Sequence, residues 1–156
     1  MHLSSSAFQD GKPIPAKHAH RGVQGGENIS IPLTWVDIPS ETSSLALSII
    51  DPHPVANNWI HWIVINIPKE VTSLQQGCSC RHMPHGSKEL YNSFGELGYG
   101  GPQPPRGSGP HPYVVTLYAL KTEKLILPEN ASLNAFQKAL EGNILASASI
   151  TGIYER

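Results

Sequence analysis

The chain reads GYGGPQPPRGSGPHP from Gly98 to Pro112 and continues as YVVTLYAL from Tyr113 to Leu120. Ten of the fifteen residues in the first stretch are Gly or Pro. Proline lacks a backbone donor and glycine is entropically unfavourable in regular structure, so this stretch forms neither a helix nor a central strand. It predicts a stiff, irregular wall that carries His111 to the start of a strand. Because binding residues often lie on loops held by a rigid scaffold, we expect a site here.

The composition is that of one ordinary domain covering residues 1–156. The chain has 11 basic and 12 acidic residues and a formal charge of −1. It shows no basic patch of the kind that nucleic-acid binding requires. Its longest apolar runs, Leu45–Ile50 and Trp59–Ile67, are too short for a membrane span. The N-terminal residues lack the pattern of a signal peptide, so we expect a cytoplasmic protein.

Several apolar runs predict a mainly β fold. They are rich in apolar and β-branched residues and several are bounded by turn residues or prolines, as is typical of strands. The runs are Ile29–Trp35, Ser44–Ile50, Trp59–Ile67, Tyr113–Leu120 and Leu145–Tyr154. The first is expected at a sheet edge because Pro32 interrupts it.

One segment predicts a helix. Ser132 suits the N-cap position, and Gly142 suits the C-terminal end. Between them, Leu133, Phe136 and Leu140 share one face. The pattern as a whole predicts two packed antiparallel sheets with this helix at the side.

Three polar residues stand at or near the ends of predicted strands. Asp51 follows one buried strand, His61 lies within the next, and His111 precedes a third. A single histidine in an apolar strand is more often a hydrogen-bonded core residue than a ligand-binding one. Asp51-Pro52 alone is a turn signal. Only the combination of the three indicates a shared site.

Longer segments around these residues resemble the phosphatidylethanolamine-binding protein family, which includes the Raf kinase inhibitor proteins and their bacterial and archaeal relatives. The most specific segment is Tyr99–Tyr113. The likeness also rests on Asp51-Pro52, His61–Pro68, Asn92–Gly95, Phe8-x-Asp10-Gly11, Ile31–Trp35 and Gly152-x-Tyr154-x-Arg156. It covers nearly the whole chain, and the length resembles that of the prokaryotic branch.

The resemblance implies a Greek-key β-sandwich of two antiparallel sheets with one or two short helices. It also implies a small pocket at one end of the large sheet that binds anions and phosphate-bearing head groups. The residues matching that pocket are Asp51, His61, Gly101, Gln103, Pro104, Pro105, His111 and Tyr113. Imidazoles and free backbone amides are suited to binding an oxyanion. No metal or other cofactor is expected.

The sequence departs from the family's usual pattern beside the pocket. His53 stands where relatives usually have Asp, and Pro112 stands where they usually have Arg. Both are expected at the pocket rim. There His53 would add a third imidazole, and the affinity for anions would increase more strongly at acidic pH. Gln103 replaces a cysteine that is common in prokaryotic relatives, which removes a reactive thiol from the wall.

The only cysteines, Cys78 and Cys80, are arranged as Cys-x-Cys. A disulfide across one residue is strained. Together with His82 and His85 they could form a small metal site, whereas the simpler interpretation is two thiols in a surface loop.

Three functions remain open. The first is a binding protein for a small anionic or phosphorylated ligand that modulates a partner such as a kinase or a protease. The second is a serine protease inhibitor acting through exposed loops. The third is a hydrolase using Asp and His residues or a metal, although no strand–turn–helix elbow surrounds Ser108. We expect binding rather than enzymatic activity, and a homodimer as in many prokaryotic relatives.

Overall fold

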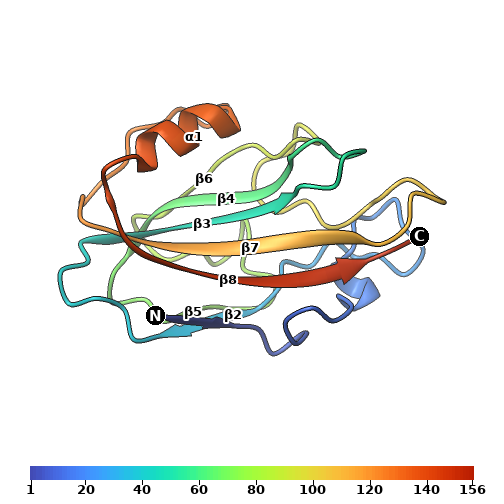
Figure 1. Ribbon diagram of the computed structural model, residues 1–156, viewed down its shortest axis with the longest axis horizontal. Coiled ribbons are helices and arrows are strands. Elements are labelled where there is room, and N and C mark those ends of the chain that lie inside the picture. Colours follow the sequence, from blue (N-terminus) through green and yellow to red (C-terminus); the bar gives the residue numbers. More distant parts are fainter.

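The computed structural model describes residues 1–156 and shows two antiparallel β-sheets facing each other (Figure 1). The larger sheet has five strands in the order β6-β4-β3-β7-β8, and the smaller has three in the order β1-β2-β5. The larger sheet is formed by β3 (Ser44–Asp51), β4 (Trp59–Pro68), β6 (Lys88–Glu89), β7 (His111–Leu120) and β8 (Ile144–Tyr154). The smaller is formed by β1 (His2–Ser4), β2 (Leu33–Val36) and β5 (Ser73–Leu74).

The predicted mainly β sandwich is confirmed, and so are its long strands. β3, β4 and β7 match the predicted runs to within one or two residues, and β8 begins one residue earlier than predicted. The strand expected at a sheet edge is instead the middle strand of the smaller sheet, since β2 pairs with both β1 and β5. It is also shorter than predicted, because β2 begins only after Pro32. Proline cannot donate to the sheet ladder, so regular pairing starts beyond it. The short strands β1, β5 and β6 were not predicted.

The larger sheet is covered on both sides. One apolar cluster fills the space between the two sheets and includes Trp35, Trp62 and Leu117. A second cluster packs the opposite face of the larger sheet against α1 (Leu133–Leu140), mainly through Phe136. Figure 1 shows α1 and the smaller sheet on opposite sides of the five-stranded sheet. This double burial explains why β3 and β4 are apolar along almost their whole length.

The helix has the predicted boundaries. The Ser132 side chain accepts a hydrogen bond from the Ala135 backbone amide at 3.0 Å, which caps the N-terminus. Gly142 has a φ of +72°, the left-handed conformation typical of a residue just beyond a helix. A short 3₁₀ turn, η1 (Ala16–His18), is the second helical element. No helix is long and apolar enough to cross a membrane.

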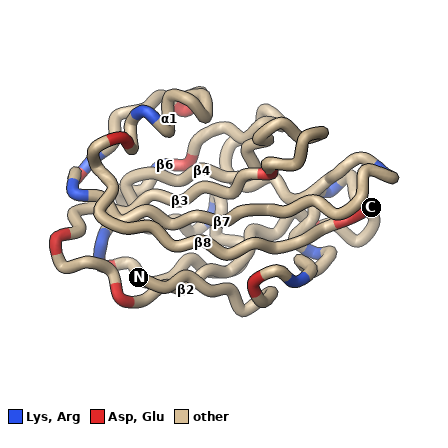
Figure 2. Tube along the Cα trace, in the orientation of Figure 1, with Lys and Arg blue, Asp and Glu red and all other residues tan.

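Charged side chains are almost excluded from the long strands. Figure 2 shows that Lys, Arg, Asp and Glu lie mainly on loops and on α1, while the strands of the larger sheet are nearly free of them. Asp51, at the end of β3, is the only such residue in β3, β4, β7 and β8. It is also only 2% exposed. A buried carboxylate among these otherwise uncharged long strands requires specific partners.

The Gly/Pro wall is fastened to the N-terminal arm by backbone contacts. The His20 amide donates to the Pro102 carbonyl at 3.0 Å. The Tyr99 hydroxyl donates to the His18 carbonyl at 2.7 Å. A Cβ added to Gly101 would collide with the His18 carbonyl oxygen and would come within 2.7 Å of the His20 nitrogen. Glycine is therefore required at this position for close approach of two backbone segments.

Replacing Gly101 by alanine should destabilise the protein strongly. The added methyl group meets backbone atoms of residues 18–20, which cannot move aside as a flexible side chain could, so we expect the free energy of unfolding to fall by about 3 kcal/mol. Gly86→Ala is the control, because a Cβ there meets no atom within 4 Å although φ is +93°. It should cost about 1 kcal/mol. If urea unfolding showed that both variants lose the same free energy of unfolding, the close backbone packing of the wall at Gly101 would be contradicted.

Candidate functional site

The ends of three neighbouring strands bring the predicted residues together. β3 lies between β4 and β7 and is antiparallel to both. The C-terminal end of β3 therefore lies beside the N-terminal ends of its two neighbours. Asp51 is the register partner of Trp59, the first residue of β4. On the other side, Ile50 is the register partner of Val114, near the start of β7.

A β-bulge sets the position of His61. Ile49 pairs with Trp62 and Ile50 pairs with Ile60, so His61 is an extra residue with no partner on β3. Bulges of this kind redirect a side chain at one point in a strand. The change of face is visible in the core, since Trp62 joins the cluster between the sheets while Ile60 joins the cluster beside α1.

These strand ends surround a cavity of about 240 Å³. It is lined by Asp51, Val55, Ala56, Trp59, His61, Phe94, Gln103, Pro104, Pro105, His111 and Tyr113. Seven of the eight residues expected in the pocket are among them. The eighth, Gly101, does not line the cavity, and its backbone amide donates a hydrogen bond to the Asn28 side-chain oxygen at 2.7 Å. No Lys or Arg lines the cavity.

At the floor of the cavity, Asp51 and His111 form a buried pair. His111 Nδ1 lies 2.6 Å from Asp51 Oδ2, and the two side chains are 1% and 3% exposed. The other carboxylate oxygen accepts a hydrogen bond from the His53 backbone amide at 2.9 Å. His111 Nε2 lies 2.8 Å from the Ser108 hydroxyl. Both nitrogens of His111 are therefore engaged within the protein.

His61 has one engaged nitrogen and one free nitrogen. Its Nδ1 lies 2.7 Å from the Gly100 carbonyl oxygen, which only accepts, so Nδ1 carries the proton. Burial lowers the pKa of His61 to about 4, against opposing effects of Gly100 and Asp51. The ring is therefore neutral near pH 7. Its Nε2 makes no hydrogen bond within the protein and presents a lone pair in this tautomer, so it accepts rather than donates a hydrogen bond.

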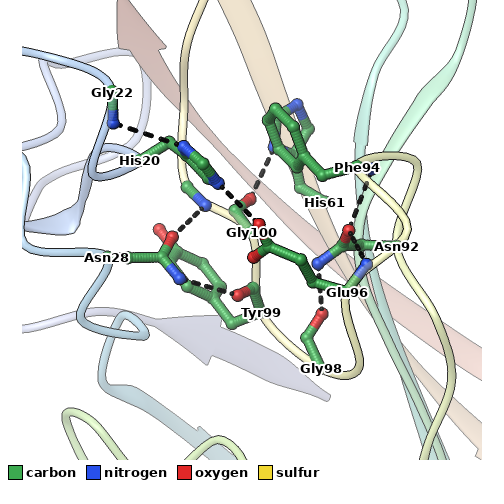
Figure 3. Close-up of polar contacts among 11 residues, drawn as sticks. His20, Gly22, Asn28, His61, Asn92, Phe94, Glu96, Gly98, Tyr99 and Gly100 are labelled. Carbon is green, nitrogen blue, oxygen red and sulfur yellow. Dashed lines mark hydrogen bonds and ion pairs between the residues drawn. The ribbon is translucent and has the colours of Figure 1, made fainter.

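A polar network holds the wall segment against His61 (Figure 3). The Asn28 side chain donates to the Tyr99 carbonyl oxygen at 3.1 Å. The Asn92 side chain donates to the Gly98 carbonyl oxygen at 3.0 Å and accepts from the Phe94 amide at 2.9 Å. Because both asparagines are fixed through backbone groups, the Gly100 carbonyl that orients His61 is held in place.

Two lining residues carry buried donors without partners. These are the Trp59 indole nitrogen Nε1 and the Tyr113 hydroxyl. Burial, assisted by the nearby Asp51 carboxylate, raises the pKa of Tyr113 well above its ordinary value, so the hydroxyl keeps its proton. An unpartnered buried donor loses its hydration without compensation. Both atoms are closed to solvent in the empty site, so a ligand that accepts hydrogen bonds reaches them only if the two side chains shift.

The two expected rim residues take other places. The His53 ring stacks on the His111 ring at 3.8 Å between centroids and does not itself line the cavity. Pro112 lies between His111 and Tyr113 on β7, so strand alternation directs its side chain to the opposite face of the sheet. Neither of the two residues expected at the rim lines the cavity. His53 affects the site through its contact with His111.

Sequence reasoning missed several apolar lining residues, among them Val55, Ala56, Trp59 and Phe94. Trp59 begins a predicted strand, and Phe94 belongs to a segment that carried the family resemblance, so both lay beside recognised signals. Their role depends on how the loops fold back over the strand ends. Phe94 packs edge-on against Trp59, with 5.3 Å between ring centroids.

The two cysteines lie outside this cavity. Cys78 is buried and Cys80 is exposed, and both thiols are free. Burial and the neighbouring Glu89 carboxylate raise the pKa of Cys80. No group of three or more His, Cys, Asp or Glu side chains is placed to hold a metal ion. The Cys-x-Cys segment thus has the arrangement of two separate thiols.

The low pKa of His61 gives stability a defined dependence on pH. In the folded state this residue remains neutral down to about pH 4, whereas the ordinary pKa of a histidine is 6.5. Below pH 6.5 the unfolded chain therefore binds more protons, and the free energy of unfolding should fall by about 3 kcal/mol from this residue as pH drops to 4. His61→Asn retains a donor for Gly100 and does not titrate, so its urea-unfolding stability should vary less with pH. An equally steep profile would contradict the assignment.

The chain is similar to proteins across several organisms. A family model described as phosphatidylethanolamine-binding protein matches residues 4–155. A UPF0098 protein of Methanothermobacter thermautotrophicus is 41% identical over 157 residues, covering 100% of this chain and 99% of the relative. The crystal structure of Escherichia coli YbcL, described as a new member of the mammalian PEBP family, matches with a TM-score of 0.92 and 36% identity, covering 99% of this chain and 98% of that chain.

A more distant likeness concerns the fold alone. A carboxypeptidase Y inhibitor, solved in complex with its cognate proteinase, matches with a TM-score of 0.56 and 21% identity, covering 99% of this chain and 82% of that chain. The family model and the full-length relatives decide the assignment, because each spans almost all of the sequence. The chain belongs to the phosphatidylethanolamine-binding protein family.

Proposed function

We propose that this protein binds a small oxyacid that retains one proton, such as the monoanion of a phosphate monoester. The observation that carries the proposal is the set of unpaired polar groups on the cavity residues. His61 Nε2 is an unpaired acceptor, while the Tyr113 hydroxyl and the Trp59 indole are unpaired donors. A phosphate monoester monoanion offers one hydroxyl to the acceptor and oxygens to both donors.

The charge of the site supports a singly protonated ligand over a fully ionised one. The cavity contains the Asp51 carboxylate and no Lys or Arg. A dianion would therefore bring two further negative charges near a buried carboxylate, without a fixed cation to offset them. It would also face the lone pair of His61 instead of a donor. A ligand that brings its own proton avoids this repulsion.

The remaining lining is suited to an organic substituent. Val55, Ala56, Phe94 and Pro104 contribute apolar surface around the polar floor. A cavity of about 240 Å³ is smaller than a typical drug-sized pocket, so it holds a head group and not a long chain. This favours a small phosphorylated or carboxylic compound as the ligand.

A protein partner, a kinase or a protease, is the second part of the proposal. Val55 lines the cavity and is 58% exposed, and exposed Pro105 lies on the same lining. An exposed apolar rim of this kind provides a surface whose shape depends on whether the cavity is filled. Inhibition of a serine protease through this rim is the alternative form of the same interaction.

Isothermal titration with phosphoethanolamine tests the ligand. We expect Tyr113→Phe and Trp59→Phe each to weaken binding about tenfold, because each removes one donor. Tyr118→Phe is the matched control, since that hydroxyl belongs to the α1 side of the sheet. Affinity should rise as pH falls from 8 to 6, because the fraction of monoanion grows as the pH approaches the second pKa of a phosphate monoester, about 6. Equal affinity for sulfate and phosphate at pH 7 would contradict the need for a ligand proton.

The partner is tested by measuring the activity of a panel of kinases and serine proteases with added protein. We expect inhibition of at least one enzyme, and a changed inhibition constant when phosphoethanolamine fills the cavity. Val55→Ser should weaken the inhibition by a larger factor than it weakens phosphoethanolamine binding, because Val55 is an exposed rim residue. Absence of any effect on the panel would remove the regulatory part of the proposal. Light scattering on the same sample measures whether the expected homodimer forms.

A further inference from the structure

Ser108 occupies a turn that occurs twice in this chain. The sequences Pro84-His-Gly-Ser87 and Pro105-Arg-Gly-Ser108 have the same pattern. In each, the serine hydroxyl donates to the carbonyl oxygen of the proline three residues earlier, at 2.6 Å. In each, the preceding glycine has a positive φ. The hydroxyl-to-carbonyl contact is thus a property of the turn and does not distinguish the two serines.

What distinguishes Ser108 is its second contact. Its hydroxyl oxygen lies 2.8 Å from His111 Nε2, while His111 Nδ1 lies 2.6 Å from Asp51 Oδ2. Ser87 makes no hydrogen bond to a histidine. The chain Ser108–His111–Asp51 therefore has the connectivity of a nucleophile, a base and an orienting carboxylate. The buried carboxylate fixes the tautomer of His111, leaving Nε2 to exchange a proton with the serine.

The surroundings of Ser108 leave room for a reacting group. Its side chain is only partly buried. A Cβ added to Gly107 or Gly109 would meet no atom within 4 Å, so no other segment packs closely against the backbone on either side of Ser108. The Gly109 amide makes no hydrogen bond to the protein. The amide that follows a nucleophile is a common donor to the oxyanion formed in acyl transfer.

We propose that Ser108 is a nucleophile for acyl transfer from small carboxylic esters, with His111 as its general base. The hydroxyl turns from Pro105 towards His111, and its oxygen attacks the ester carbonyl carbon while the proton passes to Nε2. The carbon–oxygen bond of the ester then breaks, and the departing alkoxide takes this proton. Water attacks the resulting acyl-serine, and the same proton transfers release the acid and restore the serine. The overall reaction is ester plus water to acid plus alcohol.

This activity goes beyond the proposed binding function and departs from the expectation of a protein without enzymatic activity. The adjoining cavity limits the substrate. Pro105 and His111 both line the cavity, so an acyl or alcohol group attached at Ser108 lies at its edge. The small volume and apolar walls of that cavity favour short acyl groups.

A fluorophosphonate probe on the full chain tests the proposal. We expect one covalent adduct, located by peptide mass spectrometry on Ser108 and not on Ser87. Ser108→Ala should abolish the adduct, and Ser87→Ala should leave its rate unchanged. Asp51→Asn should slow labelling by a factor of about 100 or more, because His111 loses its orienting partner. The rate of p-nitrophenyl acetate hydrolysis should change in the same way, with a loss in Ser108→Ala, a decrease in Asp51→Asn and no change in Ser87→Ala.

Several results would overturn the assignment. These are no adduct, an adduct at another residue, equal labelling of Ser108 and Ser87, or an Asp51→Asn variant that folds and reacts as fast as the parent. If Asp51→Asn does not fold, the proposal is tested by comparing probe labelling of Ser108 with that of Ser87 in the unaltered chain. Ser108→Ala should retain phosphoethanolamine binding, so the loss of esterase activity and the loss of ligand binding are distinguishable.

Discussion

The contact between Asp51 and His111 is the interaction on which the rest of the site depends. It places the only charged residue of the four long strands in a protein interior, 2.6 Å from an imidazole nitrogen. An unpaired carboxylate at this depth would be strongly destabilising, by several kcal/mol. The pair therefore ties the end of β3 to the start of β7, and the His53 amide and ring complete its surroundings. The loops that follow β3 and precede β7 both contribute residues to the cavity above this floor.

The pair also determines which hydrogen-bonding groups in the cavity are free to contact a ligand. Since both nitrogens of His111 are occupied, the free acceptor of the cavity is His61, which the bulge in β4 and the Gly100 carbonyl hold in a neutral form. The site thus combines one acceptor with the unpaired donors of Tyr113 and Trp59. On the proposed function, hydrogen bonding and not a fixed positive charge holds the oxyacid. The same buried pair, extended through Ser108, has the connectivity needed to activate a hydroxyl.

Much of the architecture could be predicted from the sequence, because the long strands and α1 have clear apolar patterns and end at proline, glycine or Ser132. The short strands β1, β5 and β6 could not, since two or three residues carry no periodic signal. Asp51, His61 and His111 were recognisable through the family resemblance. The bulge, the histidine tautomer and the unpaired hydroxyl could not be predicted, because they arise from strand register and side-chain packing. No strand–turn–helix elbow surrounds Ser108 in the sequence, whereas in the structure a tight Pro-x-Gly-Ser turn places its hydroxyl 2.8 Å from His111 Nε2.

The protonation of the two histidines during ligand binding is the central claim. Nitrogen-15 NMR of the histidine side chains, recorded at pH 7 during titration with phosphoethanolamine, measures it directly. His61 should be neutral with its proton on Nδ1 before the ligand is added, and its Nε2 resonance should then shift as it accepts a hydrogen bond. His111 should retain its proton on Nδ1 throughout, because Asp51 holds it there. A His61 that carries both protons before the ligand is added, or an unchanged Nε2 resonance at saturation, would contradict the account.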